Sequence, residues 1–332
     1  MKSYSIFDDI ITVYGIANFN KEKKITRLPS NVIARVPDLE FLGRRVPGAR
    51  VGFRTNSKSL NVKIELETLS VDIGISIYGC QSAFVYAGEH TSSKFLGIVS
   101  PPNYDTKIYD RTFDLSGEMQ DILIFLPRNE IIKSVEISID DDAIMKRATP
   151  YKYAKPILYY GSSITEGGCC TNPACYYEAI ISRHLDVDYY CFGFSGNCKG
   201  DLPLAEFFNT LDFSIFVYDY DHNAPTVEHL IATHEPFYKA IREANPSTPI
   251  IMMTRPRPYL TKDEEQRREV VKTTYESAIK NGDQNVYFID GTSFFDGNDG
   301  ELCFVDGTHP NDLGFFKMAT KIEPLIKSLL KE

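Results

Sequence analysis

The spacing of hydrophobic residues divides the chain into two parts. Between residues 40 and 150, apolar or alternating runs are short, and Gly, Asn, Ser and Pro separate them. Alternation such as Leu60, Val62 and Ile64 places one face of a strand in a core and the other in solvent. Short strands with turn residues between them predict a β-sandwich without helices. The strands are expected within residues 49–55, 59–67, 72–79, 83–88, 94–99, 121–127 and 133–140.

From Pro156 onward, buried strands alternate with helical patterns. Strands are expected within residues 157–161, 188–194, 213–220, 249–255 and 285–290. Helices are expected within residues 174–185, 226–244, 262–281 and 311–330. This alternation predicts a parallel sheet covered by helices on both faces. The junction lies near residues 148–156, so we expect a β-sandwich domain over residues 1–150 and an α/β domain over residues 151–332.

Composition and charge narrow the possible partners. Of the 332 residues, 43% are hydrophobic and 24% are charged, which is typical of a globular protein. The formal net charge of −9 argues against nucleic-acid binding. The N-terminus lacks the pattern of a signal peptide, and no apolar run approaches the ~20 residues of a membrane span, so we expect a cytoplasmic protein without a membrane partner. The sequence does not determine the oligomeric state and is compatible with a homo-oligomer.

The cysteines favour reduced thiols over disulfides or metal. There are seven, an odd number with uneven spacing, which fits a reducing compartment. Cys169, Cys170 and Cys175 cluster, with Cys198 further along, so a zinc site remains an alternative. Zinc sites usually show pairs of cysteines answered by a second pair or by histidines, and that pattern is missing here. We therefore expect buried thiols and no metal.

Polar residues follow four of the strands expected in the second half. The first strand runs into GSSIT, the second into GFSGN and the third into DYDHN, and DGTHP comes after the fifth. The carboxyl ends of parallel strands meet at one edge of a sheet. Acyl transfer needs a nucleophile, donors for the oxyanion, and a base with its acceptor. The serine can act as the nucleophile, the glycine and the asparagine as the donors, and the His and Asp of the D-x-x-H pattern as the base and its acceptor.

These segments resemble the sequence blocks of the SGNH (GDSL-type) hydrolases. GSSIT is similar to the GDSIT block of that family, FSGN to its second block, the HN of DYDHN to its third, and DGTHPN to its fifth. The resemblance implies that Ser163 is the nucleophile and that Asp306 and His309 complete a catalytic triad. It also implies an oxyanion hole made by the backbone N–H groups of Ser163 and Gly196 and by the side chain of Asn223.

The resemblance covers about residues 155–332 and extends to the architecture. It implies a flavodoxin-like, three-layer α/β/α domain with a parallel sheet, preceded by a jelly-roll-like β-sandwich. That order of domains resembles carbohydrate acetyl esterases. The sequence departs from the family pattern at Ser162, where the family has Asp, and around Asn223, which follows His222 and precedes Ala224.

Other roles remain open for several of these residues. Ser195 is a second candidate nucleophile, although GFSG lacks the G-x-S-x-G spacing of a nucleophile elbow. Ser163 is also a candidate helix N-cap, Asp306 a turn cap, and Asn223 a partner of loop carbonyls. No phosphate-binding glycine loop follows Gly161.

Further polar residues lie near the same edge or in the first half. His222 is expected to contact substrate or to be structural, and Arg255 and Arg257 either contact substrate or pair with surface acids. The arginines near the start of the β-rich region are expected to form a solvated face rather than a binding patch; they are Arg44, Arg45, Arg50 and Arg54.

The sequence therefore predicts a serine esterase that hydrolyses O-acetyl esters, with an acetylated plant-type oligo- or polysaccharide, or a small-molecule ester, as substrate. The mechanism requires no metal or organic cofactor. Two alternatives remain: a lipase or thioesterase for longer acyl chains, and a catalytically inactive carbohydrate-binding protein. The absence of Trp slightly weakens the sugar interpretation, but 20 Tyr are available for stacking on sugars.

Overall fold

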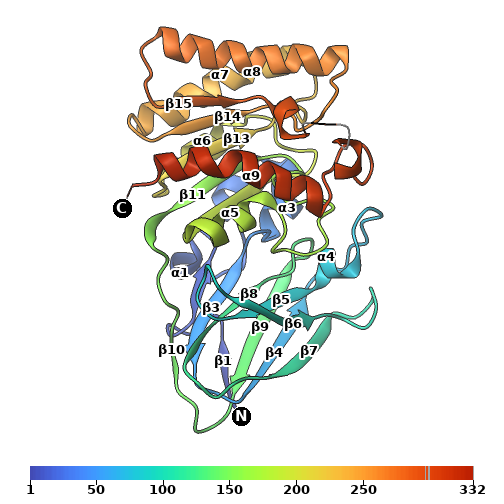
Figure 1. Cartoon of the computed structure of the whole chain (residues 1–332), viewed down its shortest axis with the longest axis vertical. Helices are drawn as coiled ribbons and strands as arrows, with labels where there is room; N and C mark the ends of the chain where they lie inside the picture. Colours follow the sequence, from blue (N-terminus) through green and yellow to red (C-terminus); the bar gives the residue numbers. More distant parts are fainter. Residues whose placement is uncertain (296, 298–299, 332) are drawn as a thin grey trace.

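The computed structural model describes residues 1–295, 297 and 300–331. Figure 1 shows two stacked regions: an antiparallel sandwich around the N-terminus and, above it, a parallel sheet between helices. The strands of the first region are β1 (Lys2–Ser5), β2 (Thr12–Tyr14), β3 (Arg50–Thr55), β4 (Ser59–Leu66), β5 (Ala83–Ala87), β6 (Lys94–Val99), β7 (Ile108–Asp114), β8 (Gln120–Phe125), β9 (Ile132–Ile139) and β10 (Met145–Arg147). Its short helices are α1 (Phe19–Glu22), α2 (Ser30–Ile33), η1 (Pro37–Leu39), α3 (Glu40–Arg44) and α4 (Ile77–Gln81).

The sandwich consists of two antiparallel sheets. One has the strand order β1-β9-β4-β7, and the other has the order β10-β3-β8-β5-β6 with β2 beside β3. Leu60, Val62 and Ile64 of β4 are fully buried, as their alternation predicts. The side chains that the two sheets bury form one continuous apolar core. The expected β-sandwich is confirmed.

The structure corrects three details of the first half. Residues 72–79 form a turn and the start of α4 instead of a strand, because Asp72 accepts the N–H of Gly74 and Ser76 caps the helix through the N–H of Gly79. The region also contains short helices, which were not expected. Finally, the strands β1, β2, β7 and β10 were not expected; in β7, two buried aromatic residues are separated by exposed polar ones.

The second region alternates strand and helix as expected. Its strands are β11 (Tyr153–Gly161), β12 (Val187–Gly193), β13 (Ile215–Asp219), β14 (Ile250–Met253) and β15 (Val286–Ile289). Its helices are α5 (Tyr177–Leu185), α6 (Leu202–Phe208), α7 (Val227–Ala244), α8 (Lys262–Lys280), η2 (Gly291–Phe295), η3 (Gly300–Cys303) and α9 (Asp312–Leu329). Of these, α6 and the short helices η2 and η3 were not predicted.

The five strands pair in parallel in the order β12-β11-β13-β14-β15, which is the flavodoxin-like order. Alternate residues of β11 face opposite layers: Leu158 and Tyr160 pack with the core under α6, α7 and α8, and Ile157 and Tyr159 pack with the core under α5 and α9. The predicted three-layer α/β/α fold is confirmed. Its strands end in GSSIT, GFSGN and DYDHN on one edge.

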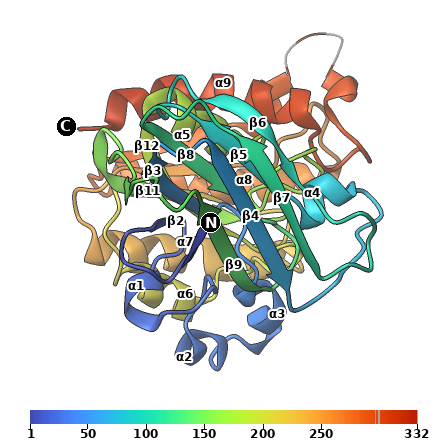
Figure 2. The same cartoon turned by 90° about the horizontal axis from the view of Figure 1, so that it is seen from below.

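The two regions share apolar packing. Leu28, Leu39 and Leu42 belong to the core under α6–α8, and Phe84 and Phe125 belong to the core under α5 and α9. Figure 2 shows α2 beside α6, which it contacts. The division into domains at residue 150 stays a prediction.

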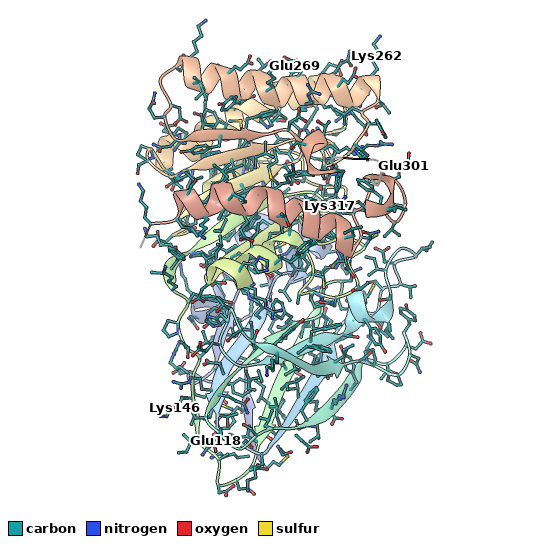
Figure 3. The ribbon with its side chains drawn as sticks, in the orientation of Figure 1. Glu118, Lys146, Lys262, Glu269, Glu301 and Lys317 are labelled. Atoms are coloured by element: carbon teal, nitrogen blue, oxygen red, sulfur yellow. The ribbon has the colours of Figure 1, made fainter. Side chains whose placement is uncertain are left out.

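Charged side chains cover the ends of the molecule. In Figure 3, Glu118 and Lys146 lie at the far end of the sandwich, and Lys262 and Glu269 project from α8; all four are exposed. Across the described residues, no helix combines the length and the apolar character that crossing a membrane requires.

Candidate active site

Ser163 lies in a tight turn that begins where β11 ends. The N–H groups of Glu166 and Gly168 donate to the carbonyls of Ser162 and Ser163 at 2.9 and 2.7 Å, so the chain curls back directly after the strand. Gly161 makes this turn possible, because a Cβ there would lie 1.7 Å from Asp219 Oδ1. Ser162 is fully buried, whereas Ser163 is partly exposed.

Asp306 and His309 lie in the loop between η3 and α9. Asp306 Oδ1 accepts the backbone N–H groups of Thr308 and His309 at 2.9 and 2.7 Å, and Oδ2 lies 2.7 Å from His309 Nδ1. Partial burial raises the pKa of Asp306, but these hydrogen bonds outweigh it and lower the pKa to about 2. The carboxylate therefore stays charged beside the imidazole.

Ser163, His309 and Asp306 form a continuous hydrogen-bonded chain. Ser163 Oγ lies 2.8 Å from His309 Nε2, and the opposite ring nitrogen contacts Asp306. A neutral imidazole held this way accepts the serine proton on one side and donates to the carboxylate on the other. The structure thus brings together three residues that are up to 146 positions apart in the sequence.

Gly196 and Asn223 line the same cleft as Ser163. Gly196 has a φ of +68°, a left-handed conformation that favours glycine, and no atom lies within 4 Å of the place where a Cβ would stand. Asn223 sits in the turn after β13, where its backbone N–H donates to the carbonyl of Tyr220. Its side-chain Oδ1 is buried without a hydrogen-bond partner among the described residues.

Ser195, the other candidate nucleophile, forms its hydrogen bond with a carboxylate and not with a histidine. Its Oγ donates to Glu166 Oε2 at 2.5 Å, and its backbone N–H donates to the same oxygen at 2.9 Å. Glu166 is fully buried and forms an ion pair with Arg45 at 2.9 Å. Burial raises the pKa of Glu166, but Arg45, Arg27 and Arg128 together hold it below its usual value. This arrangement fixes the segment that carries Gly196.

His222 belongs to a second Ser-His-Asp chain beside the first. Its Nε2 lies 2.7 Å from Ser162 Oγ, and its Nδ1 lies 2.9 Å from Asp221 Oδ1. This second chain has its serine fully buried, although its histidine, His222, lines the cleft that contains Ser163. It ties the turn after β13 to the turn after β11. Sequence reasoning assigned no carboxylate to His222, although Asp221 directly precedes it.

Arg255 and Arg257 share a carboxylate partner. Both form ion pairs with Glu264, at 2.6 and 2.7 Å. Arg255 also donates to Thr308 Oγ1 at 3.1 Å and lines the cleft, so it supports the loop that carries His309. Of the four arginines expected on a solvated face, Arg45 and Arg50 are buried, which corrects that expectation. Both pair with acids of the second half, Arg45 with Glu166 and Arg50 with Asp188.

The cleft around Ser163 has a volume of about 640 Å³ and lies between the two halves of the chain. The second half provides Ser163, His309 and the turns that carry Gly196 and Asn223. The first half provides a wall made of residues 72–75 together with Arg45, Arg128 and Asn129. Sequence reasoning did not identify the residues of this wall or Glu166, because none of them lies in a local motif.

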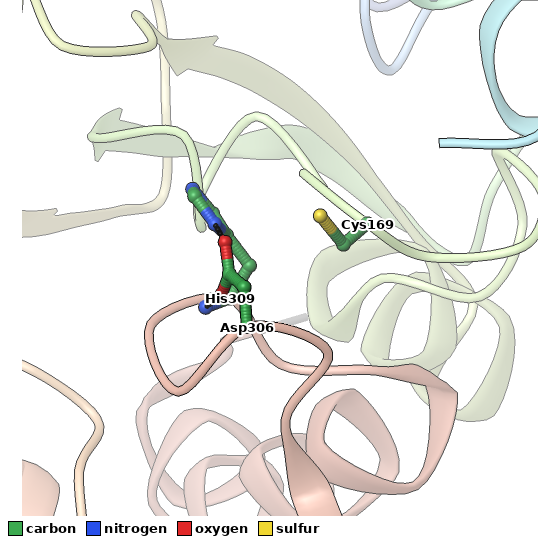
Figure 4. A group of neighbouring side chains, drawn as sticks. All are labelled: Cys169, Asp306 and His309. Carbon is green, nitrogen blue, oxygen red and sulfur yellow. Dashed lines mark hydrogen bonds and ion pairs between the residues drawn. The ribbon is translucent and has the colours of Figure 1, made fainter. Parts of the chain in front are cut away.

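The cysteines that cluster in the sequence do not form a group with metal-ligand geometry in the described part of the chain. The group found there is Cys169, Asp306 and His309, whose ligand atoms lie within 4.8 Å of one another. Figure 4 shows Asp306 beside His309, with the thiol of Cys169 set apart from both. Two of the three residues already belong to the chain that ends at Ser163. Five of the seven cysteines are buried.

Comparison with known proteins agrees with this architecture. The GDSL-like Lipase/Acylhydrolase family matches residues 154–327, and the N-terminus of Esterase_SGNH_hydro-type matches residues 4–145. A search of curated proteins gives no match. A protein from Bacteroides ovatus ATCC 8483 described as a GDSL-like lipase is 26% identical, with a TM-score of 0.88 over 99% of this chain and 98% of its own.

Two more distant structures share the fold. The salicylyl-acyltransferase SsfX3 from a tetracycline biosynthetic pathway is 21% identical, with a TM-score of 0.82 over 99% of this chain and 97% of its own. A family two carbohydrate esterase from Clostridium thermocellum, in complex with cellohexaose, is 15% identical, with a TM-score of 0.67 over 96% of this chain and 98% of its own. The family match spans more than half of the chain, and the chain belongs to the GDSL-like lipase/acylhydrolase (SGNH) family of ester hydrolases.

Proposed function

We propose that this protein is a serine esterase that removes O-acetyl groups from acetylated plant-type oligo- or polysaccharides. The observation that carries the proposal is the chain from Ser163 Oγ through His309 to Asp306, with contacts of 2.8 and 2.7 Å. These three residues line a cleft at the strand ends of a GDSL-like fold. The structural likeness to a carbohydrate esterase adds support for a sugar ester as substrate.

In the proposed reaction, Ser163 Oγ attacks the acetyl carbonyl carbon and passes its proton to His309 Nε2. The N–H groups of Ser163 and Gly196 and the side-chain amide of Asn223 stabilise the oxyanion. Collapse breaks the bond to the sugar oxygen, which takes the proton from His309. Water then gives a proton to His309 and attacks the acetyl carbonyl carbon. Collapse breaks the bond to Ser163 Oγ, which takes that proton back from His309, and acetic acid leaves.

We propose that the acyl group is short. The aliphatic side chains among the described residues that line the cleft are those of Ile73 and Ile75, and both lie on the wall from the first half. A lipase or thioesterase for long chains needs an extended apolar groove instead. We further propose that residues 1–150 act as a separate domain that helps to bind the alcohol part of the substrate.

The test is acetate release from a panel of acetylated glycans, with aryl acetate, butyrate and octanoate esters measured in parallel. We expect glycan deacetylation, rapid acetate hydrolysis and poor octanoate hydrolysis. Ser163→Ala should lose about 10⁴-fold or more in kcat. Ser195→Ala, the matched control, should lose far less. Fast octanoate cleavage without acetate release from any glycan would contradict the carbohydrate assignment, and no ester hydrolysis at all would favour an inactive binding protein.

A further inference from the structure

The first half of the chain lines the cleft with two buried arginines. Arg45 follows α3 and is 7% exposed, and Arg128 follows β8 and is 1% exposed. Both line the cleft that contains Ser163, with Asn129 beside them. Guanidinium groups are seldom buried unless acceptors surround them, because desolvation of an unpaired charge is costly.

These two guanidinium groups have more N–H donors than acceptors. Arg128 Nη1 donates to the Glu166 carbonyl at 3.4 Å, whereas its Nε and Nη2 are buried without a partner among the described residues. Arg45 Nη2 contacts Asn129 Oδ1 at 2.7 Å and Glu166 Oε1 at 2.9 Å, and its Nε has no partner there either. Buried donors without acceptors require an explanation, since nearly all such groups in folded proteins are paired.

This cluster also holds more positive than negative charges. Arg27, Arg45 and Arg128 all act on the single carboxylate of Glu166. The guanidinium group of Arg27 donates hydrogen bonds to four backbone carbonyls, those of Leu42, Arg45, Cys191 and Gly193. Burial raises the pKa of the Cys80 thiol near Arg128 to about 11, so that thiol stays neutral. Three guanidinium groups thus face one carboxylate inside a protein whose overall charge is −9.

The other carboxylates of the cleft do not neutralise this excess positive charge. Asp306 is engaged by His309, and Asp72 is exposed and accepts the N–H of Gly74 at 3.2 Å. We propose that the cleft binds esters whose alcohol part carries a carboxylate, such as acetylated uronic acid units, and that Arg128 and Arg45 bind that carboxylate. The planar guanidinium suits a carboxylate, which accepts two parallel hydrogen bonds. This inference rests on the proposed esterase function and specifies its substrate class.

The experiment compares acetylated oligogalacturonides that have free carboxyl groups with the same oligosaccharides after methyl esterification of those groups. The second probe keeps the sugar and the acetyl groups and removes the charge. We expect kcat/KM to be about tenfold or more higher for the free acid, as charge-assisted hydrogen bonds allow. Arg128→Met should lose this preference, and Arg128→Lys should keep part of it. Arg111→Met, at an exposed arginine of β7, is the matched control and should behave like the wild type.

A binding measurement tests the carboxylate subsite independently of ester hydrolysis. Inhibition of neutral aryl acetate hydrolysis by galacturonate and by galactose gives two inhibition constants that differ by one carboxylate. We expect galacturonate to bind more tightly to the wild type and equally to galactose in Arg128→Met, with melting temperatures confirming that both proteins are folded. Equal hydrolysis of the free acid and its methyl ester, equal inhibition, and an Arg128→Met enzyme unchanged in both assays would overturn the subsite. Absence of Ser163-dependent hydrolysis of the neutral aryl acetate would overturn the esterase proposal instead.

Discussion

At the scale of single residues, Asp306 keeps its negative charge well into the acidic range. The pKa of its carboxyl group lies near 2, below the ordinary 3.8, because N–H groups of His309 and Thr308 donate to it. The stabilisation that comes from this shift is present above the ordinary value and is lost as the pH falls toward 2. At mildly acidic pH Asp306 therefore remains charged and keeps its contact with His309 Nδ1.

Asp306→Asn tests this assignment. We expect kcat to fall by roughly 10⁴, because an amide favours the wrong imidazole tautomer while the loop geometry is kept. Asp312→Asn is the matched control, since its amide oxygen can still accept the N–H of Thr171 outside the cleft. The measurement is kcat against pH for the three proteins. An Asp306→Asn enzyme with wild-type rates at every pH would show that another group orients His309.

At the scale of elements, the close approach of β11 and β13 sets the nucleophile turn. Gly161→Ala would place a Cβ 1.7 Å from Asp219 Oδ1 and 2.2 Å from Thr165 Oγ1, all in the buried interior. We expect a loss of about 3 kcal/mol or more in the free energy of unfolding, at the upper end for overpacking. Gly282→Ala, where φ is +92° and no atom lies within 4 Å, should cost about 1–2 kcal/mol from backbone strain alone. Urea denaturation measures both, and equal losses would contradict the packing argument.

The elements of the second half could be predicted because their patterns are local. All five strands and the four long helices carry continuous apolar runs or helical periodicity, and the motifs lie where those runs end. The first half was harder to predict. Residues 72–79 look apolar enough for a strand, but side-chain caps at Asp72 and Ser76 turn them into a helix start. The strand character of β7 was hidden by the charged residues between Tyr109 and Phe113.

At the scale of the whole molecule, an ion pair connects the first half to the oxyanion candidate. Arg45 contacts Glu166, Glu166 holds Ser195, and Gly196 follows directly. No local pattern in the sequence reveals this, because Arg45 and Glu166 are far apart and neither belongs to a motif. For the same reason, burial of Arg45 and Arg50 could not be predicted from their neighbours. At this scale, therefore, what was missed consists of contacts between the halves.

We expect Arg45→Met to lower the free energy of unfolding by about 1–3 kcal/mol, because it removes the closest cation of Glu166 while Arg27 and Arg128 still act on that carboxylate. The double variant Arg45→Met/Glu166→Gln should lose less than the sum of the two single variants, since it removes both charges. The pKa of Glu166 is lowered in the folded protein, so this stabilisation is present at neutral pH and declines in acid. Denaturation of the four proteins at neutral pH measures the coupling, and strictly additive losses would argue against it.

The central claim is that Ser163 is the nucleophile of the esterase. Labelling with an organophosphate ester such as diethyl 4-nitrophenyl phosphate, followed by peptide mass spectrometry, tests it most directly, because the reagent leaves a stable adduct on an activated serine. We predict one adduct per chain, located on Ser163, with loss of esterase activity in step with labelling, and no adduct in Ser163→Ala or His309→Ala. An adduct on Ser195, or complete inactivation with Ser163 unmodified, would contradict the claim.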